Sequence, residues 1–249
     1  MSDIKLIPID PTWVQKDNRM DIEISGGIRM RSYYHLDGGG GWMKDFFSDV
    51  ITKIGKKKYT RGFEWCSGFG ILGFEALGRG QCDHMTFSDY YPAAIRDCLD
   101  TAKNNGLSNK VRGYVTGQIS TIPESDKWDL VIGNPPHAFG TVTQTKGLYL
   151  EMDISSIENI LRVVCDEGMA IHKEFFTNIK NHLLPDADIF LYEPVECVSS
   201  ILNELKFIRS CGIDLISQHS IDPYLSAMPD NMDINIHKGG MIMHFKELK

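Results

Sequence analysis

Short apolar runs alternate with stretches of helical length between about residue 59 and residue 212. Buried strands are predicted at 62–66, 85–88, 111–116, 130–133 and 188–192, and helices at 71–77, 92–104, 155–164, 174–183 and 198–205. Two further strands are predicted near the end of the chain, at 207–209 and 241–245. Strands that alternate with helices form a parallel sheet covered on both faces. We therefore expect an α/β fold: a doubly wound, mostly parallel, seven-stranded Rossmann-like sheet with an antiparallel final strand.

The segment before the sheet, residues 1–58, is less regular, and we expect a leader beside a domain at 59–249. It contains a weakly alternating strand at 28–34, four glycines at 38–41 and a helix at 42–54. The glycines are either a plain loop or a flexible entrance for a substrate. A polar stretch at 219–240 is either a lid or disordered, and the sequence does not decide between them.

Charge and composition restrict the partners of the chain. The formal net charge of -7 argues against attachment to nucleic acid through phosphate contacts. Lys56–Lys58 are a candidate basic patch, but a solvated loop is the favoured interpretation. The six cysteines contain no CxxC pair, which fits a reducing compartment, and no histidine pattern indicates a metal. The sequence shows neither a signal peptide nor a membrane span. We expect a cytoplasmic protein without metal or membrane contact. The sequence does not determine its oligomeric state.

A proline tetrad, Asn134-Pro135-Pro136-His137, follows the apolar run 128–133. Each proline fixes its own φ and restricts the residue before it, so the Asn134 carboxamide is held at the end of a strand. Ligands of open α/β sheets bind at that edge. Asn134 Oδ1 and the Pro135 carbonyl could accept both protons of a substrate NH2 and orient its lone pair. His137 could stack on a planar group or accept a released proton. The alternative is an ordinary proline turn.

Three other polar or glycine-rich points follow predicted strands. Gly68 and Gly70 allow a tight turn and close approach of a ligand, or are simply a strand-to-helix turn, and Glu64 before them could hold an ammonium group. Asp89 stands at the distance from these glycines expected of a ribose-binding acid, or caps a helix. Gln118 suits an adenine edge, or is an exposed loop residue.

Together these segments resemble a class I S-adenosylmethionine-dependent methyltransferase over roughly residues 59–212. The resemblance is carried by Glu64-Trp65-Cys66-Ser67-Gly68-Phe69-Gly70, by Asp89 and by Asn134-Pro135-Pro136-His137. The tetrad resembles the Asn-Pro-Pro-aromatic motif of enzymes that methylate amino or amide nitrogen. Two positions depart from the pattern: His137 stands where Tyr, Phe or Trp is usual, and Gln118 stands where an acid is common.

The resemblance implies a cofactor site and a catalytic site in the domain at 59–249. S-adenosylmethionine would be bound by residues that follow the first four strands: Glu64, Cys66, Gly68, Gly70, Asp89, Tyr90, Gln118 and Asn134. Asn134 and Pro135 would hold the target nitrogen, with His137 against its planar group.

The leading hypothesis is an N-methyltransferase that acts on a protein glutamine or a small molecule, because the pI is acidic and no nucleic-acid-binding appendage is evident. The second is a nucleic-acid N-methyltransferase, which salt-dependent binding would reveal. The third is a non-catalytic binding module, and the intact tetrad argues against it. The fourth is an NAD(P)-dependent oxidoreductase that uses the same glycines and acid, and the presence of the tetrad argues against it.

Overall fold

The computed structural model describes residues 19–33, 40–137, 165–227 and 238–248. Seven strands form one sheet in the order β5-β4-β3-β6-β7-β9-β8. Their bounds are β3 Tyr59–Trp65, β4 Cys82–Asp89, β5 Val111–Val115, β6 Trp128–Gly133, β7 Leu183–Glu193, β8 Ile213–Ser220 and β9 Met241–Glu247. β3 to β7 pair in parallel, whereas β9 is antiparallel to both β7 and β8. The predicted doubly wound sheet with an antiparallel final strand is confirmed.

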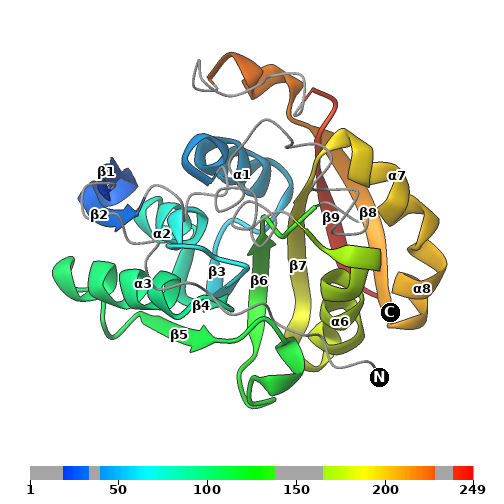
Figure 1. Ribbon diagram of the computed structural model, residues 1–249, viewed down its shortest axis with the longest axis horizontal. Coiled ribbons are helices and arrows are strands. Elements are labelled where there is room, and N and C mark those ends of the chain that lie inside the picture. The colour runs from blue at the N-terminus through cyan, green and yellow to red at the C-terminus, as the bar shows by residue number, and fades with distance from the viewer. Residues whose placement is uncertain (1–18, 34–39, 138–164, 228–237, 249) are drawn as a thin grey trace, which may run out of the picture.

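Helices cover both faces of this sheet, as Figure 1 shows. α1 (Gly40–Ile54), α2 (Ile71–Gly78) and α3 (Pro92–Asn104) share one apolar core with Leu130 and Ile132. α6 (Ala170–Asn178), α7 (Val195–Asn203) and α8 (Leu205–Ser210) share the other core with Phe63 and Val131. Neighbouring residues of one strand thus enter opposite cores, because successive side chains of a strand point to opposite faces. Double burial explains why these strands read as continuous apolar runs.

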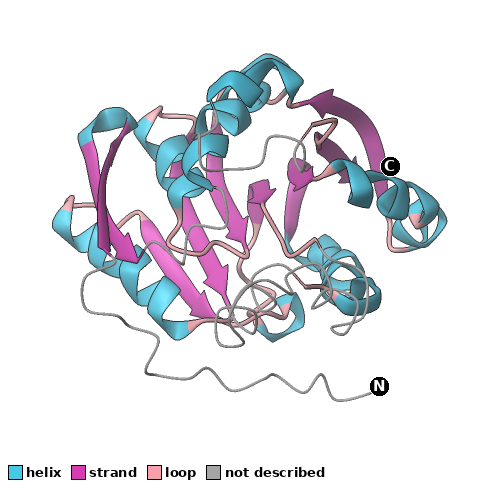
Figure 2. Cartoon of the chain, turned by 45° about the horizontal axis from the view of Figure 1, so that its top comes forward, coloured by secondary structure: helices cyan, strands magenta, loops and turns pink. Residues whose placement is uncertain are grey.

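A separate hairpin precedes α1 and packs against α2 and α3. β1 (Arg19–Ile24) and β2 (Ile28–Tyr33) are antiparallel and are joined by the short helix η2 (Ser25–Gly27), and Figure 2 shows the hairpin standing beside the main sheet. Both the backbone N–H and the hydroxyl of Ser25 donate to the Glu75 carboxylate of α2, at 3.1 and 2.6 Å. The strand expected at 28–34 is confirmed over the residues described, and β1 was not expected.

The last part of the chain corrects one strand prediction. Residues 207–209 lie in α8, and the strand next to β9 is β8. A pair of apolar residues, here Phe207 and Ile208, does not distinguish a strand from a helix. The informative signal was Gly212, whose φ of 80° ends the helix in a left-handed conformation. The helix expected at 174–183 begins earlier, at Ala170, and finishes as the short helix η6 (Ile179–His182).

Several predicted features lie outside the described residues. They are the helix at 155–164, the glycines at 38 and 39, and positions 228–237 of the polar stretch. The described residues at the start of that stretch belong to β8 and to the short helix η7 (Asp222–Ala227), and those at its end, 238–240, directly precede β9. The other short helices are η4 (Ile119–Thr121) and η5 (Glu167–Met169).

Candidate active site

The strand register brings the predicted site segments to one edge of the sheet. Trp65 of β3 pairs with Ser88 of β4 on one side and with Gly133 of β6 on the other. Asp89 pairs with Val115 of β5. The loops that follow β3, β4, β5 and β6 therefore begin at the same level, at the carboxyl ends of these parallel strands. This is the edge where open α/β sheets place their ligands.

The loop after β3 is tightly folded and needs unusual backbone angles. Cys66, Gly68 and Gly70 have φ values of 53°, 51° and 84°, all in the left-handed region. The Gly70 N–H donates to the Ser67 carbonyl at 2.8 Å. A Cβ atom on Gly70 would lie 2.7 Å from the ring of Phe87. The loop thus holds its backbone close to β4 and presents little side chain.

Asp89 ties this loop to the end of β4. Its carboxylate accepts the Gly68 N–H and the Tyr91 N–H, both at 2.8 Å. Burial raises the pKa of Asp89 to about 6, and the two N–H donors limit the rise. Each carboxylate oxygen has two lone pairs, so one on each oxygen remains for a further donor.

Glu64 is directed under α2 rather than toward open space. Its Oε2 accepts the Gly73 N–H at 2.7 Å, and the residue is 2% exposed. Burial raises the pKa of Glu64 to about 8, opposed by the N–H donors of Gly73 and Leu72. The contact that the structure shows is therefore a cap on the first turn of α2. The sequence analysis did not anticipate this cap.

Cys66, Tyr90 and Gln118 stand at the same edge. Burial, and then the negative charge of Asp89, raise the pKa of the Cys66 thiol well above its ordinary value. A Cβ on Gly117, the residue before Gln118, would lie 3.3 Å from Tyr90 Cβ, so the loops after β4 and β5 touch. The Gln118 N–H donates to Thr116 Oγ1 at 3.0 Å, and its carbonyl accepts from Thr121 Oγ1 at 2.8 Å. The backbone of Gln118 is thus fixed beside Tyr90.

The tetrad after β6 contains a contact that the sequence did not reveal. Asn134 Oδ1 lies 2.9 Å from His137 Nε2, so the carboxamide and the imidazole are partners. Pro135 and Pro136 are buried, while Asn134 and His137 are half-buried. The Cys197 thiol of α7 donates to the His137 carbonyl at 2.7 Å, which fixes the end of the tetrad. Asn134 and His137 form one unit at the end of β6.

Three buried residues that the sequence analysis missed extend from this unit. Glu193 Oε2 lies 3.4 Å from His137 Nδ1, and Glu193 Oε1 lies 3.0 Å from His172 Nε2. His172 Nδ1 is in turn 2.6 Å from Asp166 Oδ2. The available signal was the position of Glu193, which directly follows the predicted strand at 188–192 and so lies at the carboxyl edge.

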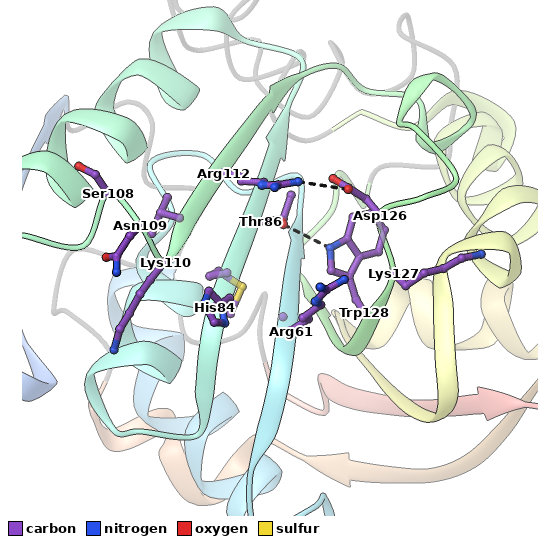
Figure 3. Close-up of a pocket in the computed structure, with 13 residues that line it drawn as sticks. Arg61, His84, Thr86, Ser108, Asn109, Lys110, Arg112, Asp126, Lys127 and Trp128 are labelled. Atoms are coloured by element: carbon purple, nitrogen blue, oxygen red, sulfur yellow. Dashed lines mark hydrogen bonds and ion pairs between the residues drawn. The ribbon is translucent and has the colours of Figure 1, made fainter.

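A second feature lies near the amino ends of β3 to β6. It is a cavity of about 460 Å³ whose lining includes the charged residues Arg61, Lys110, Arg112, Asp126 and Lys127, together with His84. Figure 3 shows Arg112 turned toward Asp126, at 3.3 Å, and the Trp128 indole turned toward Thr86. This basic groove lies at the opposite end of the strands from the tetrad.

Three further observations concern the described residues as a set. None of their helices is long and apolar enough to cross a membrane. No group of three or more His, Cys, Asp or Glu side chains among them is arranged to hold a metal ion. All six cysteines are free thiols.

The fold is that of class I S-adenosylmethionine-dependent methyltransferases, as solved structures show. The ribosomal protein L11 methylase of Lactobacillus delbrueckii subsp. bulgaricus matches 83% of this chain and 80% of its own, with 11% identity and a TM-score of 0.52. Trm5b from Pyrococcus abyssi matches 93% of this chain at 12% identity, with a TM-score of 0.58. The tRNA m1G37 methyltransferase of M. jannaschii also matches 93% of this chain at 12% identity, with a TM-score of 0.51.

These likenesses concern the fold. This chain spans 56% of the Trm5b chain and 55% of the tRNA m1G37 methyltransferase chain. No protein-family model matches the sequence, and no curated protein matches it.

Proposed function

We propose that this protein is an S-adenosylmethionine-dependent N-methyltransferase that transfers a methyl group to an amide or amino nitrogen. The observation that carries the proposal is the register of β3 and β6. Because Trp65 pairs with Gly133, the glycine loop and the tetrad leave adjacent strands at the same level. A methyl donor on the loop and an NH2 group on the tetrad would therefore be neighbours.

The residues after β3 and β4 fit the proposed cofactor. A ribose offers two hydroxyl donors, and Asp89 retains one lone pair on each carboxylate oxygen beyond its two N–H contacts. The space that a Gly70 side chain would need is filled by Phe87, so only backbone lines this part of the loop. One structure with this fold, Trm5 of Methanocaldococcus jannaschii, is described in complex with adenosine. Cys66, Tyr90 and Gln118 complete the proposed lining.

The chemistry asked of the protein is mainly positioning. When bound, S-adenosylmethionine supplies an electrophilic methyl group on positively charged sulfur. The Asn134 carboxamide oxygen and the Pro135 carbonyl accept the two protons of the target NH2 and direct the nitrogen lone pair. These bonds strengthen as the nitrogen becomes positively charged, which favours the transition state over the bound substrate. His137 lies against the planar group of the target.

We favour a protein glutamine or a small molecule as the methyl acceptor, in the reducing cytoplasm. The formal net charge of -7 and the acidic groups near Cys66 argue against a bound polyanion, and the free cysteines support a reducing compartment. One structure with this fold is named for the methylation of a ribosomal protein.

A nucleic-acid acceptor is the second candidate, and the basic groove is the observation that favours it. Among the similar structures, one is named a tRNA m1G37 methyltransferase and two are named Trm5 or Trm5b. The groove is separated from the tetrad by the length of the strands, which is about 20 Å for a six-residue strand. A nucleic acid bound in the groove would therefore have to pass around the edge of the sheet to reach Asn134.

The direct test is incubation of the protein with methyl-labelled S-adenosylmethionine and a cell lysate, followed by separation of protein, nucleic acid and small molecules. We expect label in the protein or the small-molecule fraction. Label in nucleic acid would select the second candidate, and absence of label with intact cofactor binding would indicate a non-catalytic module.

Asn134→Ala tests the tetrad itself. We expect methyl transfer to fall at least 100-fold, while the affinity for S-adenosylhomocysteine, measured by calorimetry, stays within about threefold, because the carboxamide acts on the acceptor. Asn181→Ala removes an exposed carboxamide elsewhere and serves as the matched control. Wild-type turnover in Asn134→Ala would contradict the role of the tetrad.

A further inference from the structure

The tetrad is connected to a buried chain of ionisable groups that the proposed transfer does not yet use. The chain runs from Asn134 through His137, Glu193 and His172 to Asp166, with successive distances of 2.9, 3.4, 3.0 and 2.6 Å. The side chains of Glu193, His172 and Asp166 are 1%, 0% and 0% exposed, whereas that of His137 is 20% exposed. His137 is therefore the end of the chain that reaches the candidate site.

Opposite charges stabilise the buried part of this row of side chains, which consists of Glu193, His172 and Asp166. Burial alone would lower the pKa of His172, but Glu193 and Asp166 outweigh it and raise the pKa to about 9. Burial alone would raise the pKa of Glu193, but His172 and His137 outweigh it and lower the pKa to about 2. Asp166 also accepts the backbone N–H of Ile171 at 2.7 Å, which anchors it at the start of α6. A positive His172 thus lies between two carboxylates.

The contacts of His137 restrict where its protons can be. Glu193 is an ionised acceptor, so an attractive contact at Nδ1 requires a proton on Nδ1. Asn134 Oδ1 is also an acceptor, so the contact at Nε2 requires a second proton. An imidazolium satisfies both. A neutral ring satisfies Glu193 only as the Nδ1–H tautomer, and the Asn134 carboxamide must then turn its NH2 group toward Nε2.

The remaining groups around His137 do not compete for this role. Tyr192 of β7 meets the imidazole edge-on at 5.3 Å, and burial, followed by the charge of Glu193, raises its pKa so that it stays neutral. Cys197 of α7 is also neutral, because burial raises its pKa. His137 Nδ1 and Glu193 Oε2 are buried and lie 3.4 Å apart. Neither atom has a hydrogen-bond partner among the described residues. This pair has room to shorten as the charge on His137 changes.

We propose that Glu193, held by His172 and Asp166, is a positioning residue that keeps a proton on His137 Nδ1. His137 Nε2 is then free of hydrogen and has two roles. It receives the proton of the methylated nitrogen, and it sets the orientation of the Asn134 carboxamide. This inference rests on the proposed function. With neutral His137, Asn134 turns its oxygen toward the target NH2. The methyl–sulfur bond would break as the methyl–nitrogen bond forms, and the nitrogen would become positive. The Asn134 NH2 group would then release the single lone pair of His137 Nε2, which would receive the proton of the methylated nitrogen. The imidazolium then donates its Nε2–H to Asn134 Oδ1 again, so the amine or amide product is released. His137 finally loses the proton to solvent.

This arrangement gives the unusual histidine of the tetrad a role that a Phe, Tyr or Trp side chain would not supply. Phe, Tyr and Trp have no basic nitrogen that could receive a proton near neutral pH, whereas His137 has one and also contacts the Asn134 carboxamide. Specificity for a target that must lose a proton after methylation follows from this coupling.

The decisive measurement needs neither substrate nor turnover. Long-range ¹H–¹⁵N correlation spectra of the ¹⁵N-labelled protein report which nitrogen of each histidine carries hydrogen. Once His137 is neutral, we expect the Nδ1–H tautomer in the wild type. In Glu193→Gln, His172 retains the Gln oxygen and the Gln NH2 donates to His137 Nδ1, so we expect the Nε2–H tautomer. Tyr192→Phe, which keeps a ring against His137, should leave the tautomer as in the wild type.

Kinetics supply the second readout. In Glu193→Gln we expect kcat to fall at least tenfold with the affinity for S-adenosylhomocysteine unchanged. An Nε2–H tautomer in wild-type protein, or an unchanged tautomer in Glu193→Gln, would overturn the inference. If Glu193→Gln does not fold, the wild-type spectrum decides alone. The proposed function is tested separately by Asn134→Ala, so the two can fail independently.

Discussion

Asp89 gives the sharpest quantitative prediction, because its environment fixes the pH range in which cofactor binding should change. Asp89 is half-buried, and the partial burial of its carboxylate raises its pKa to about 6. Ribose hydroxyl groups donate hydrogen bonds, so they bind the ionised carboxylate better than the protonated acid. Binding then lowers the pKa of Asp89 and releases a proton wherever the free protein holds one. Affinity must therefore rise with pH up to about 6 and level off above it.

The magnitude follows from the proton equilibrium. At pH 5, one unit below the pKa of about 6, about ten molecules of free protein carry protonated Asp89 for each that carries the ionised form. The dissociation constant of S-adenosylhomocysteine should be about tenfold weaker at pH 5 than on the plateau, which is about 1.4 kcal/mol. Close to one proton should be released per ligand bound at pH 5, and close to none from Asp89 at pH 8.

Isothermal titration calorimetry at pH 5, 6, 7 and 8, in buffers of different ionisation heat, measures both quantities. Asp89→Asn should abolish the rise between pH 5 and 7 and weaken binding on the plateau by about 1–3 kcal/mol, because a charged acceptor is lost. Asp83→Asn is the matched control, since Asp83 lies at the other end of β4 in a surface ion pair with Lys58. A wild-type affinity that does not change between pH 5 and 7 would refute the assignment of Asp89 to the ribose.

The remaining predictions concern the cap on α2, the glycine loop and the basic groove. Glu64→Gln retains an acceptor for the buried N–H, so we expect it to unfold at pH 4.5 within about 1 kcal/mol of wild type, whereas Glu64→Ala should cost about 1–3 kcal/mol in urea titrations. The wild type should lose stability relative to Glu64→Gln as pH rises from about 4.5 to about 8, because in that range the unfolded chain loses a proton that the folded protein keeps, and equal pH profiles would contradict this. Gly70→Ala should lower the free energy of unfolding by more than 2 kcal/mol, since it combines φ strain with a clash, whereas Gly80→Ala, with a φ of 69° and no atom within 4 Å, should cost about 1 kcal/mol. Similar melting temperatures for these two variants would show that the loop tolerates a side chain. Arg61→Glu/Lys110→Glu should leave kcat/KM within about twofold for a protein or small-molecule acceptor, and a loss above tenfold with a weaker salt dependence would instead select nucleic acid.

The central part of the fold was predictable because its signals are local. Double burial makes the central residues of β6 and β7 continuous apolar runs, and Pro92 marks the start of α3. Helix-ending signals were weaker: Gly212 ends α8, yet residues 207–209 were assigned to a strand because two of them are apolar. That error arose because a run shorter than one helical turn carries no periodicity.

The sequence by itself determined which groups stand after which strands, since glycines and prolines restrict the backbone at their own positions wherever the chain goes. It placed Asn134 and His137 in a rigid turn, and Asp89 at the end of a strand. Only the tertiary structure decided what these groups face. β6 and β7 are neighbours in the sheet although 49 residues separate Gly133 from Leu183, and this adjacency brings Glu193 to His137. The direction of Glu64 under α2 was likewise set by packing. Partners so distant along the chain depend on strand order and burial, which no local pattern of residues encodes.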